Sequence, residues 1–575
     1  MEIEKVIMDA VIMYAKQGDF NEILNLKNFI REGQAVLESL YYDGNKEHAV
    51  GTVIVREGVT SLENAEFMDC DKLEKVILPD SLISIDDGYF DETQENAGGA
   101  FFGCKNLNAV ILPEGLTSIG AFAFGSCGKL KEMVLPNSLT SIGDGAFACC
   151  MSLTEINLPD SLTSLGNNAF NGCHGLEKVR LPEGLIEIQA GTFFDCPSLK
   201  EINLPESLTE INEQTFKDCT SLEEITLPES LTSIGVGAFD GCTSLEKVRL
   251  PEGLTEIQAG TFYGCESLTE ISLPEGLTSI GEQAFYGCES LTEINLPEGL
   301  TTIDEQAFKG CTSLEEITLP ESLTSIGVGA FDGCTSLEKV RLPEGLTEIQ
   351  AGTFFGCNGL TEINLPEGLT SIGEQAFYGC KSLEEIMLPE GLTEIGESTF
   401  WSCESLIELN LPEGLTSIGD WAFYGCEGLR EINLPESLTS IGQWVFSGCT
   451  SLTKINLPKA LTEIAGMTFY DCTRLREVTL PEGLTSIGYA AFQSCTSLAE
   501  INLPEGLTEI DLHAFDGCTS LKVIHFPESL TEICSCAFDF CDSLKKISYY
   551  KKTEELLKNY FGDAWDKLEK NIIDD

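Results

Sequence analysis

Positively charged residues are scarce in this 575-residue chain. Lys and Arg together number 34 against 93 Asp and Glu, so the formal net charge at pH 7 is −59. Such a chain is repelled by phosphate backbones and by anionic membrane surfaces, because it has few cations that could displace their counterions. The composition therefore argues against nucleic acids as partners and favours a basic protein or a cation.

Histidine is rare too, and familiar catalytic motifs are missing. The chain has four histidines, His48, His174, His513 and His525, scattered over its length. An active site needs several unlike groups that converge on one place, and the sequence has no HExxH helix, no zinc-type CxxC pair and no P-loop. We therefore predict a protein that is not an enzyme, with no catalytic residue, no metal site and no cofactor.

Long apolar segments are also lacking. No run of 18 apolar residues is available to cross a bilayer. The first residues, MEIEKVIMDAVIMYAKQGDF, lack the basic region and the small-residue cleavage site of a signal peptide. As it stands the sequence predicts no membrane insertion and a cytoplasmic location.

What the sequence does contain is a repeat. Prolines recur every 23 residues from Pro113 to Pro527, and Pro79 belongs to the same series, displaced by an 11-residue insertion. We count 21 units between about Ala49 and Tyr550. Repetition at a fixed period of this length indicates a solenoid rather than several globular domains.

Within one unit the apolar residues predict two short extended segments and a turn. Positions are counted from the proline, which is position 0. In one unit the apolar positions −6, −3, −1, +3, +6, +10, +11 and +14 are Leu291, Ile294, Leu296, Leu300, Ile303, Ala307, Phe308 and Cys311. Alternation before the proline is typical of a half-buried strand, and the proline ends it. A single unit cannot bury this face alone, so neighbouring units must stack with parallel strands.

Cysteine occupies one position of the repeat. Of 24 cysteines, 21 lie at position +14, and position +11 is phenylalanine in all 21 units. Stacked side chains that point the same way are poorly placed for disulfides, which need opposed Cβ vectors. We predict buried free thiols beside a buried phenyl column. The cluster Cys534, Cys536 and Cys541 leaves a metal site open as an alternative, although no fourth ligand is evident.

Both ends of the chain depart from the period. Residues 1–48 have helix-like apolar spacing, which predicts an N-terminal helical cap or, as an alternative, a separate interaction module. Residues 551–575 predict a C-terminal helical cap. Its apolar side would carry Leu556, Leu557, Tyr560, Phe561, Trp565 and Leu568. The expected domains are thus residues 1–48, a solenoid at 49–550 with an insertion near 86–99, and residues 551–575.

The repeated pattern LxxIxLPxxLxxIxxxAFxxCxxL resembles that of the BspA-like leucine-rich repeat family. The resemblance covers about 500 residues and recurs some twenty times. It implies a leucine-rich repeat solenoid that acts in adhesion and protein binding rather than in catalysis. It also implies a location at the cell surface or outside the cell, which the N-terminal residues do not themselves indicate.

Aromatic residues gather at two outward positions late in the chain. Positions +9 and +12 carry Tyr378, Trp401, Trp421, Tyr424 and Trp444. Tryptophan and tyrosine are favoured anchors of interfaces, so we predict a patch there that binds a protein or a glycan. Local packing is the alternative.

The outward strand position −4 is predominantly acidic. It includes Glu270, Glu293, Glu362, Glu431 and Glu500. Stacked carboxylates repel one another, and basic pairs such as Lys339 and Arg341 interrupt the series. The strand face is either a solvated surface or a site for a basic ligand or cation.

Two further features favour a second class of function. Residues 219–262 and 311–354 are identical, which suits a spacer or a multivalent platform better than a unique active site. The acidic insertion, DDGYFDETQENAGG at 86–99, lacks EF-hand ligand spacing, and weak calcium binding is its alternative to a solvated loop.

Overall fold

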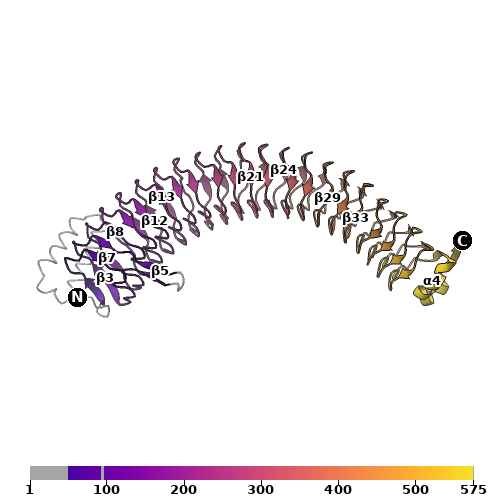
Figure 1. The fold of residues 1–575 in the computed structure, drawn as a ribbon, viewed down its shortest axis with the longest axis horizontal. Coiled ribbons are helices and arrows are strands. Elements are labelled where there is room, and N and C mark those ends of the chain that lie inside the picture. The colour runs from indigo at the N-terminus through magenta and orange to yellow at the C-terminus, as the bar shows by residue number, and fades with distance from the viewer. Residues whose placement is uncertain (1–48, 92–95, 574–575) are drawn as a thin grey trace. The chain divides into compact units, whose positions relative to one another are not determined.

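The computed structural model describes residues 49–91 and 96–573, and the predicted N-terminal cap at residues 1–48 lies outside them. The fold is the predicted repeat solenoid of short parallel strands (Figure 1). Each coil has one strand just before the proline position, here called the first strand, and one after it, the second strand. The chain divides into two compact units, Met1–Leu254 (unit 1) and Thr255–Asp575 (unit 2), which are described separately.

Unit 1 contains both series of strands. Its first strands are β1 (Gly51–Ile54), β3 (Leu73–Ile77), β7 (Ala109–Ile111), β10 (Glu155–Asn157), β12 (Lys178–Arg180), β14 (Glu201–Asn203) and β17 (Lys247–Arg249). Its second strands are β2 (Ser61–Leu62), β4 (Ser84–Ile85), β8 (Ser118–Ile119), β9 (Ser141–Ile142), β11 (Ser164–Leu165), β13 (Glu187–Ile188), β15 (Glu210–Ile211) and β16 (Ser233–Ile234). Neighbouring coils pair in register at an offset of one repeat, as in the sheet order β10-β12-β14.

Unit 2 continues both series. Its first strands are β19 (Glu270–Ser272), β22 (Glu316–Thr318), β24 (Lys339–Arg341), β26 (Glu362–Asn364), β28 (Glu385–Ile386), β30 (Glu408–Asn410), β32 (Glu431–Asn433), β34 (Lys454–Asn456), β36 (Glu477–Thr479), β38 (Glu500–Asn502), β40 (Val523–Phe526) and β42 (Lys546–Tyr550). Its second strands are β18 (Glu256–Ile257), β20 (Ser279–Ile280), β21 (Thr302–Ile303), β23 (Ser325–Ile326), β25 (Glu348–Ile349), β27 (Ser371–Ile372), β29 (Glu394–Ile395), β31 (Ser417–Ile418), β33 (Ser440–Ile441), β35 (Glu463–Ile464), β37 (Ser486–Ile487), β39 (Glu509–Ile510) and β41 (Glu532–Ile533).

The buried positions of a coil are those that the period predicts. In the unit that contains Pro297 every predicted apolar residue is buried except Leu296, which is half-buried next to the proline. The outward residues Glu316 and Thr318 of β22 are exposed on either side of buried Ile317. The alternation before each proline therefore marks a strand with one face in the core.

Two columns of identical side chains fill the interior. The position +11 phenyl rings stack at centroid distances such as 5.3 Å for Phe285 and Phe308, with planes 7° apart. The thiol of Cys311 donates a hydrogen bond to the carbonyl oxygen of Phe285 at 3.2 Å, and the N–H of Cys288 donates to the same oxygen. Each thiol thus satisfies the second lone pair of a buried carbonyl, which a simple hydrophobe could not do.

The cysteines are free, as predicted, and those at position +14 are buried except Cys541, which is half-buried. Desolvation by burial raises the pKa of Cys311 and of Cys426 to about 12, so these thiols stay protonated at neutral pH. The column therefore consists of neutral hydrogen-bond donors rather than of reactive thiolates.

The third side of each coil, here called the turn side, holds neighbouring coils together by backbone hydrogen bonds. The N–H groups at positions +9, +11 and +13 donate to carbonyls of the next coil, as Trp421 does to Gln443 and Phe423 does to Val445. These bonds require a left-handed backbone at positions +9 and +13 in coil after coil, and Trp421 has a φ of 55°. The turn side is thus a ladder with a fixed direction.

Glycine at position +7 follows from the close approach of neighbouring coils. A Cβ atom on Gly143 would lie 2.5 Å from the backbone nitrogen of Ala121 in the preceding coil, and one on Gly327 would lie 2.4 Å from that of Glu305. A side chain would clash at these two coils, whereas other coils carry a residue such as Gln258 or Asp304 at the same position.

The insertion in unit 1 forms an antiparallel hairpin. Strands β5 (Tyr89–Asp91) and β6 (Asn96–Gly98) pair with each other, and β5 is labelled in Figure 1. Gly88 donates its N–H to the carbonyl of Ala121 at 2.7 Å, which ties the base of the hairpin to the next coil.

The C-terminal segment is only partly helical. Helix α4 spans Glu554–Phe561 and ends at Gly562, which has a φ of 48°; the 3₁₀ segments η2 (Lys551–Thr553) and η3 (Gly562–Lys567) flank it. Trp565 therefore lies in η3 rather than on the predicted helix, and a strand that the sequence did not predict, β43 (Glu569–Ile573), pairs in parallel with β42. Tyr560 accepts the N–H of Phe538 at 2.7 Å, a donor that another coil would otherwise satisfy.

Candidate binding surfaces

The five predicted aromatic residues lie together on the turn side of unit 2. They belong to a longer set, here called the aromatic stripe, which consists of Phe355, Tyr378, Trp401, Trp421, Tyr424, Trp444 and Tyr470. Each of its members is half-buried. The predicted patch did not include Phe355 or Tyr470, although both occupy the same position +12 as Tyr378.

Four rings of the stripe form one stacked column. Ring centroids are 4.5 Å apart for Phe355 and Tyr378, 5.5 Å for Tyr378 and Trp401, and 4.1 Å for Trp401 and Tyr424. The planes of these pairs differ by 8°, 17° and 25°. Because each ring covers the face of the next, the column presents mainly ring edges to the solvent.

The two position +9 tryptophans are arranged differently. Trp421 lies 6.4 Å from Trp401 with the planes tilted by 48°, and Trp444 lies 6.2 Å from Tyr424 with a tilt of 54°. Trp444 also lies 5.9 Å from Tyr470, and it bridges a coil whose position +12 is the small residue Ser447. Neither tryptophan is stacked on another ring of the described residues, in contrast to the rings of the column.

Both tryptophans occupy a strained backbone conformation. Their φ angles are 55° and 61°, whereas Gly329 and Gly352 fill the same position elsewhere in unit 2 with φ of 60° and 61°. A left-handed conformation costs an L-residue about 1–2 kcal/mol, a cost that glycine avoids. Other non-glycine residues adopt the same conformation at position +9, including Gln283, Gln375 and Met467, so the strain by itself does not set the tryptophans apart.

Position +12 outside the stripe shows how the same column packs without aromatic residues. Lys309 forms an ion pair with Asp332 at 2.8 Å, just before Phe355 in the column. Its hydrogen bond to Asp332 raises the pKa of Lys309. Earlier in the chain, Tyr263 and Tyr286 form a stacked pair with centroids 4.6 Å apart. Side chains at position +12 of neighbouring coils therefore contact one another whether or not they are aromatic. Within the described residues, the stripe differs in having tilted tryptophans beside this column.

The acidic strand face is exposed where the sequence places it. All five predicted glutamates, Glu270, Glu293, Glu362, Glu431 and Glu500, are exposed. Glu362 pairs in register with Glu385 and Glu408 with Glu431, so the carboxylates of neighbouring strands adjoin one another. The basic interruptions form ion pairs, such as Lys454 with Glu477 at 3.0 Å. The strand face is thus on a different side of the coil from the aromatic stripe.

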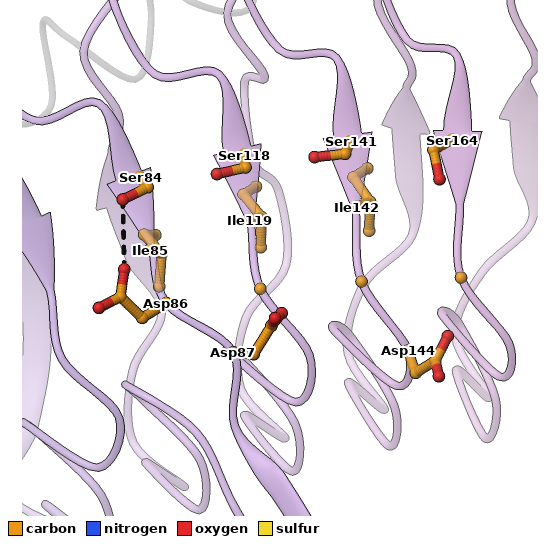
Figure 2. Close-up of a pocket in the computed structure, with 13 residues that line it drawn as sticks. Ser84, Ile85, Asp86, Asp87, Ser118, Ile119, Ser141, Ile142, Asp144 and Ser164 are labelled. Atoms are coloured by element: carbon orange, nitrogen blue, oxygen red, sulfur yellow. Dashed lines mark hydrogen bonds between the residues drawn. The ribbon is translucent and has the colours of Figure 1, made fainter.

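A groove in unit 1 runs along the second strands, and the carboxylates that line it bind backbone groups of the chain itself (Figure 2). Its lining includes Ser84, Ser118, Ser141, Ser164, Asp86, Asp87 and Asp144. Asp87 accepts the N–H of Ala121 at 2.9 Å and Asp144 accepts that of Asn167 at 2.7 Å. These carboxylates satisfy backbone donors of the next coil, and we assign the groove no ligand.

The candidate metal clusters can be described in part. Among residues 49–91 and 96–573 no group of three or more His, Cys, Asp or Glu side chains is arranged to hold a metal ion, and this includes Cys534, Cys536 and Cys541. The tip of the acidic insertion, residues 92–95, lies outside the described residues.

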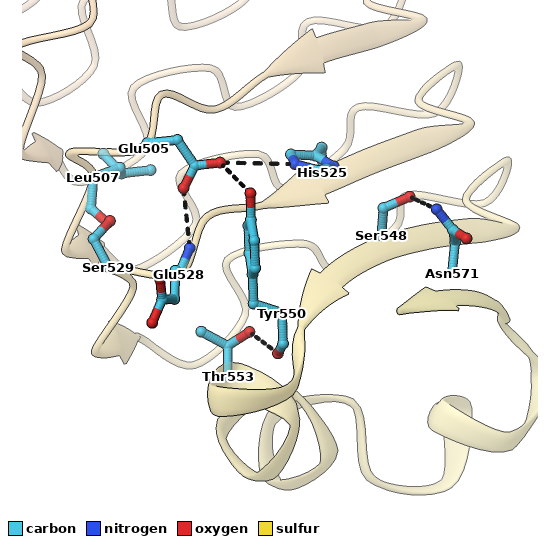
Figure 3. Close-up of polar contacts among 9 residues, drawn as sticks. All are labelled: Glu505, Leu507, His525, Glu528, Ser529, Ser548, Tyr550, Thr553 and Asn571. Atoms are coloured by element: carbon cyan, nitrogen blue, oxygen red, sulfur yellow. Dashed lines mark hydrogen bonds and ion pairs between the residues drawn. The ribbon is translucent and has the colours of Figure 1, made fainter. Parts of the chain in front are cut away.

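His525, near the C-terminus, takes part in a structural contact. His525 lies 3.9 Å from the carboxylate of Glu505, which also accepts a hydrogen bond from Tyr550 at 3.1 Å and one from the N–H of Glu528 at 3.3 Å (Figure 3). Glu505 thereby joins three successive coils.

Within the part of the chain that the structure describes, no helix is long and apolar enough to cross a bilayer.

Comparison with solved structures finds leucine-rich repeat proteins. The chain is similar to a leucine-rich repeat protein from Bacteroides ovatus, with 30% identity, 73% of this chain and 92% of that chain covered, and a TM-score of 0.41. It is similar to a leucine-rich repeat protein of T. pallidum, with 34% identity over 30% of this chain and 78% of that chain and a TM-score of 0.27.

A leucine-rich cell surface protein from Faecalibacterium prausnitzii is 24% identical, with 72% and 83% of the two chains covered and a TM-score of 0.25. No curated protein matches the sequence. The profile described as BspA type leucine rich repeat region matches residues 38–98, 95–223, 209–338, 324–453 and 445–566. Because these matches span most of the sequence, the chain belongs to the BspA-type leucine-rich repeat family.

Proposed function

We propose that this protein is a non-enzymatic binding scaffold of the adhesin type, which recognises another protein mainly through the aromatic stripe. The observation that supports this most directly is the pair of half-buried, unstacked tryptophans beside the stacked column, Trp421 and Trp444. Tryptophan and tyrosine are the commonest energetic anchors of protein interfaces, and clustered exposed aromatics usually serve recognition. The family to which the chain belongs fits this class of function.

The stacked column suits a protein partner better than a glycan. Sugars recognise aromatic side chains by lying flat on a ring face, and the column from Phe355 to Tyr424 has its faces covered by neighbouring rings. Ring edges and the hydroxyl groups of Tyr378 and Tyr424 suit the mixed apolar and polar surface of a protein instead. In this proposal the acidic strand face, Glu270 to Glu500, contributes long-range attraction rather than the hot spot.

A location at the cell surface belongs to the same proposal. It rests on the family and on the adhesin class of function, and it can be checked by immunostaining unpermeabilised cells that express the complete gene. Staining that appears only after permeabilisation would assign the scaffold to the cytoplasm.

The binding proposal is tested with the double variant Trp421→Gly/Trp444→Gly. Glycine is chosen because Gly329 and Gly352 already serve at this position, so the turn keeps its backbone. Proteins captured from candidate host and bacterial extracts are identified, purified and titrated one by one. We expect at least one to bind the wild type and to lose at least tenfold in affinity, about 1.4 kcal/mol, with the double variant.

The matched control is Tyr263→Ala/Tyr286→Ala, which removes a stacked pair at position +12 of unit 2 outside the stripe. We expect its affinities to equal those of the wild type. Purified partners that bind both double variants equally well would remove the stripe from the binding site.

A further inference from the structure

The chemistry around the two tryptophans narrows the kind of partner. We infer that the aromatic stripe binds a basic segment of a partner protein, with an arginine or lysine side chain held against the open face of Trp421 or Trp444 and paired with carboxylates beside it. This inference rests on the proposed function, because it specifies the partner of the same surface.

The rings of the aromatic stripe differ in whether their faces are stacked on a neighbouring ring. The column rings Tyr378, Trp401 and Tyr424 cover one another, whereas the tilted Trp421 and Trp444 are not stacked on any ring of the described residues. The face of an indole ring carries the negative part of its quadrupole, and it is the best aromatic surface for a cation. A cationic side chain is therefore the group that these two faces attract most strongly.

The chain itself gives a precedent at its fourth tryptophan. Lys570 lies 5.0 Å and Lys558 lies 5.9 Å from the centroid of the Trp565 ring, so this indole already holds cations of its own chain. Among the described residues no lysine or arginine is placed in this way over Trp421 or Trp444. Their faces remain available for a cation that another molecule supplies.

Carboxylates occur at positions +8 and +15 of the coils that form the stripe. On the side of position +8, Glu397 is exposed and Asp420 directly precedes Trp421. On the side of position +15, Glu404 and Glu427 are exposed three residues after Trp401 and Tyr424. These four residues, here called the acidic margins, precede position +9 and follow position +12 of the coils that form the stripe.

The existing ion pairs support this arrangement. Glu404 is paired with Lys381 at 2.9 Å, which shows that the margin at position +15 accepts an ammonium group. Asp420 accepts the N–H of Gln443 at 2.7 Å with one carboxylate oxygen, and its second oxygen accepts no hydrogen bond from the described residues. An arginine that stacks on Trp421 could donate to such an oxygen in the plane of its guanidinium group.

The net charge of −59 adds attraction at longer range. A strongly acidic surface steers cationic partners and loses this advantage as salt rises. An apolar partner held by the stripe alone would bind with little dependence on salt. Salt dependence therefore separates a basic segment from an apolar one.

The experiment uses the full chain and three synthetic 12-residue peptides on one Gly-Ser-Leu background. One carries four arginines, the second carries citrulline at the same places, and the third carries norleucine. Citrulline keeps the shape of arginine and removes its charge. Binding is followed by the change in tryptophan fluorescence on titration at about 50 and 300 mM salt.

We expect the arginine peptide to bind at least tenfold more tightly than the citrulline peptide and to weaken several-fold at the higher salt. Trp421→Gly/Trp444→Gly should abolish this difference in affinity between the two peptides. Peptide binding to this variant is measured by calorimetry, because two of the reporting tryptophans have been removed. Glu397→Gln/Glu404→Gln/Glu427→Gln removes three of the four carboxylates of the acidic margins and leaves Asp420, which holds the backbone. It should weaken the binding of the arginine peptide by roughly three- to thirtyfold.

The control for charge is Glu362→Gln/Glu385→Gln/Glu431→Gln, which removes as many carboxylates from the acidic strand face. These are exposed and lie on another side of the coil. We expect it to change the affinity for the arginine peptide less than twofold at the higher salt.

Each contrary outcome has a definite meaning. Equal binding of the arginine, citrulline and norleucine peptides would overturn the inference and leave the stripe as an apolar protein-binding surface. Absence of arginine-peptide binding would overturn it as well, while the capture of purified proteins would still decide the proposed function. Spermine that binds as tightly as the peptide, with the same dependence on Trp421 and Trp444, would replace the protein segment by a free polycation.

Discussion

In unit 1 the outward positions +9 and +12 of one coil carry Gly145 and Ala148, whereas in unit 2 the same two positions carry Trp421 and Tyr424. The interiors of the two units differ far less. Ring centroids are 5.3 Å apart for Phe147 and Phe170 in unit 1, and 5.5 Å apart for Phe400 and Phe423 in unit 2. Inward positions are thus fixed by the stacking of coils, and outward positions on the turn side are free to diverge.

This contrast teaches where function can be sought in a solenoid. A residue that recurs in every coil serves the stack, because every coil needs it. A residue that is unusual for its position serves something local, and Trp421 and Trp444 are the clearest cases in unit 2. The three predictions below test the two halves of the comparison.

The largest effect is expected from the phenyl column. Phe170→Ala in unit 1 and Phe308→Ala in unit 2 each remove a fully buried ring that stacks on both neighbours. Each should lower the free energy of unfolding of its own unit by about 3–5 kcal/mol, because the cavity cannot collapse between fixed coils. Hydrogen exchange resolved by mass spectrometry measures the loss coil by coil.

The two values should agree within about 1 kcal/mol if the interiors are equivalent. A loss below about 1 kcal/mol in either unit would show that its column is not tightly packed there.

The next largest effect is expected at alkaline pH. Burial raises the pKa of Cys127 in unit 1 and of Cys311 in unit 2 from 9.0 to about 12. Below pH 9 the thiol is protonated in both states, and between about pH 9 and 12 only the unfolded chain releases the proton. Stability therefore falls as pH rises, by up to about 1.4 kcal/mol per pH unit for each buried thiol. Urea unfolding at pH 8 and pH 10 measures the decline.

Other groups titrate near pH 10, so the thiols are isolated with Cys288→Ala/Cys311→Ala/Cys334→Ala. This variant should be less stable than the wild type at pH 8 and should lose less stability than the wild type by pH 10. Identical slopes for the two proteins would contradict the assignment of the alkaline loss to the thiol column. The corresponding variant of unit 1, Cys127→Ala/Cys150→Ala/Cys173→Ala, should behave alike.

The smallest effect concerns backbone strain at position +9. Trp421 has a φ of 55°, so Trp421→Gly should be more stable than Trp421→Ala by about 1 kcal/mol, although both remove the same ring. In unit 1 the reciprocal change Gly237→Ala should cost about the same, because its φ is 61° and an added Cβ would meet only ordinary contacts at 3.6 Å.

Both comparisons can be made by hydrogen exchange of the mutated coil. Equal stability of the glycine and alanine variants at residue 421 would mean that the left-handed backbone is not costly there.

The features that the sequence predicted well are those that the repeat displays many times. The strand before each proline, the buried Phe308 and the free Cys311 occupy positions whose pattern recurs along the chain. Because every coil has the same environment at a given position, a single accidental residue cannot obscure the pattern. The parallel strands and the free thiols follow directly from this.

The features that it predicted poorly occur once or depend on backbone geometry. The apolar spacing from Leu556 to Leu568 is helical in period, but Gly562 ends α4 and the chain continues as β43. The left-handed backbone at position +9 is hidden because glycine, glutamine and tryptophan all occur there. The tilt of Trp421 and Trp444 against the column depends on their neighbours in adjacent coils, which no single-coil pattern encodes.

The one-way ladder on the turn side bears on how such a chain can change its length. Among the described residues, coils on this side donate to the coil that follows and accept from the coil before it, so the two surfaces of an inner coil are complementary to each other. A whole coil can therefore be gained or lost in mid-stack without creating a new kind of junction. The identical copies at residues 219–262 and 311–354 are what unequal recombination within such a gene would leave behind. The reach of the protein can thus evolve in steps of one coil, while its recognition surface changes by substitution.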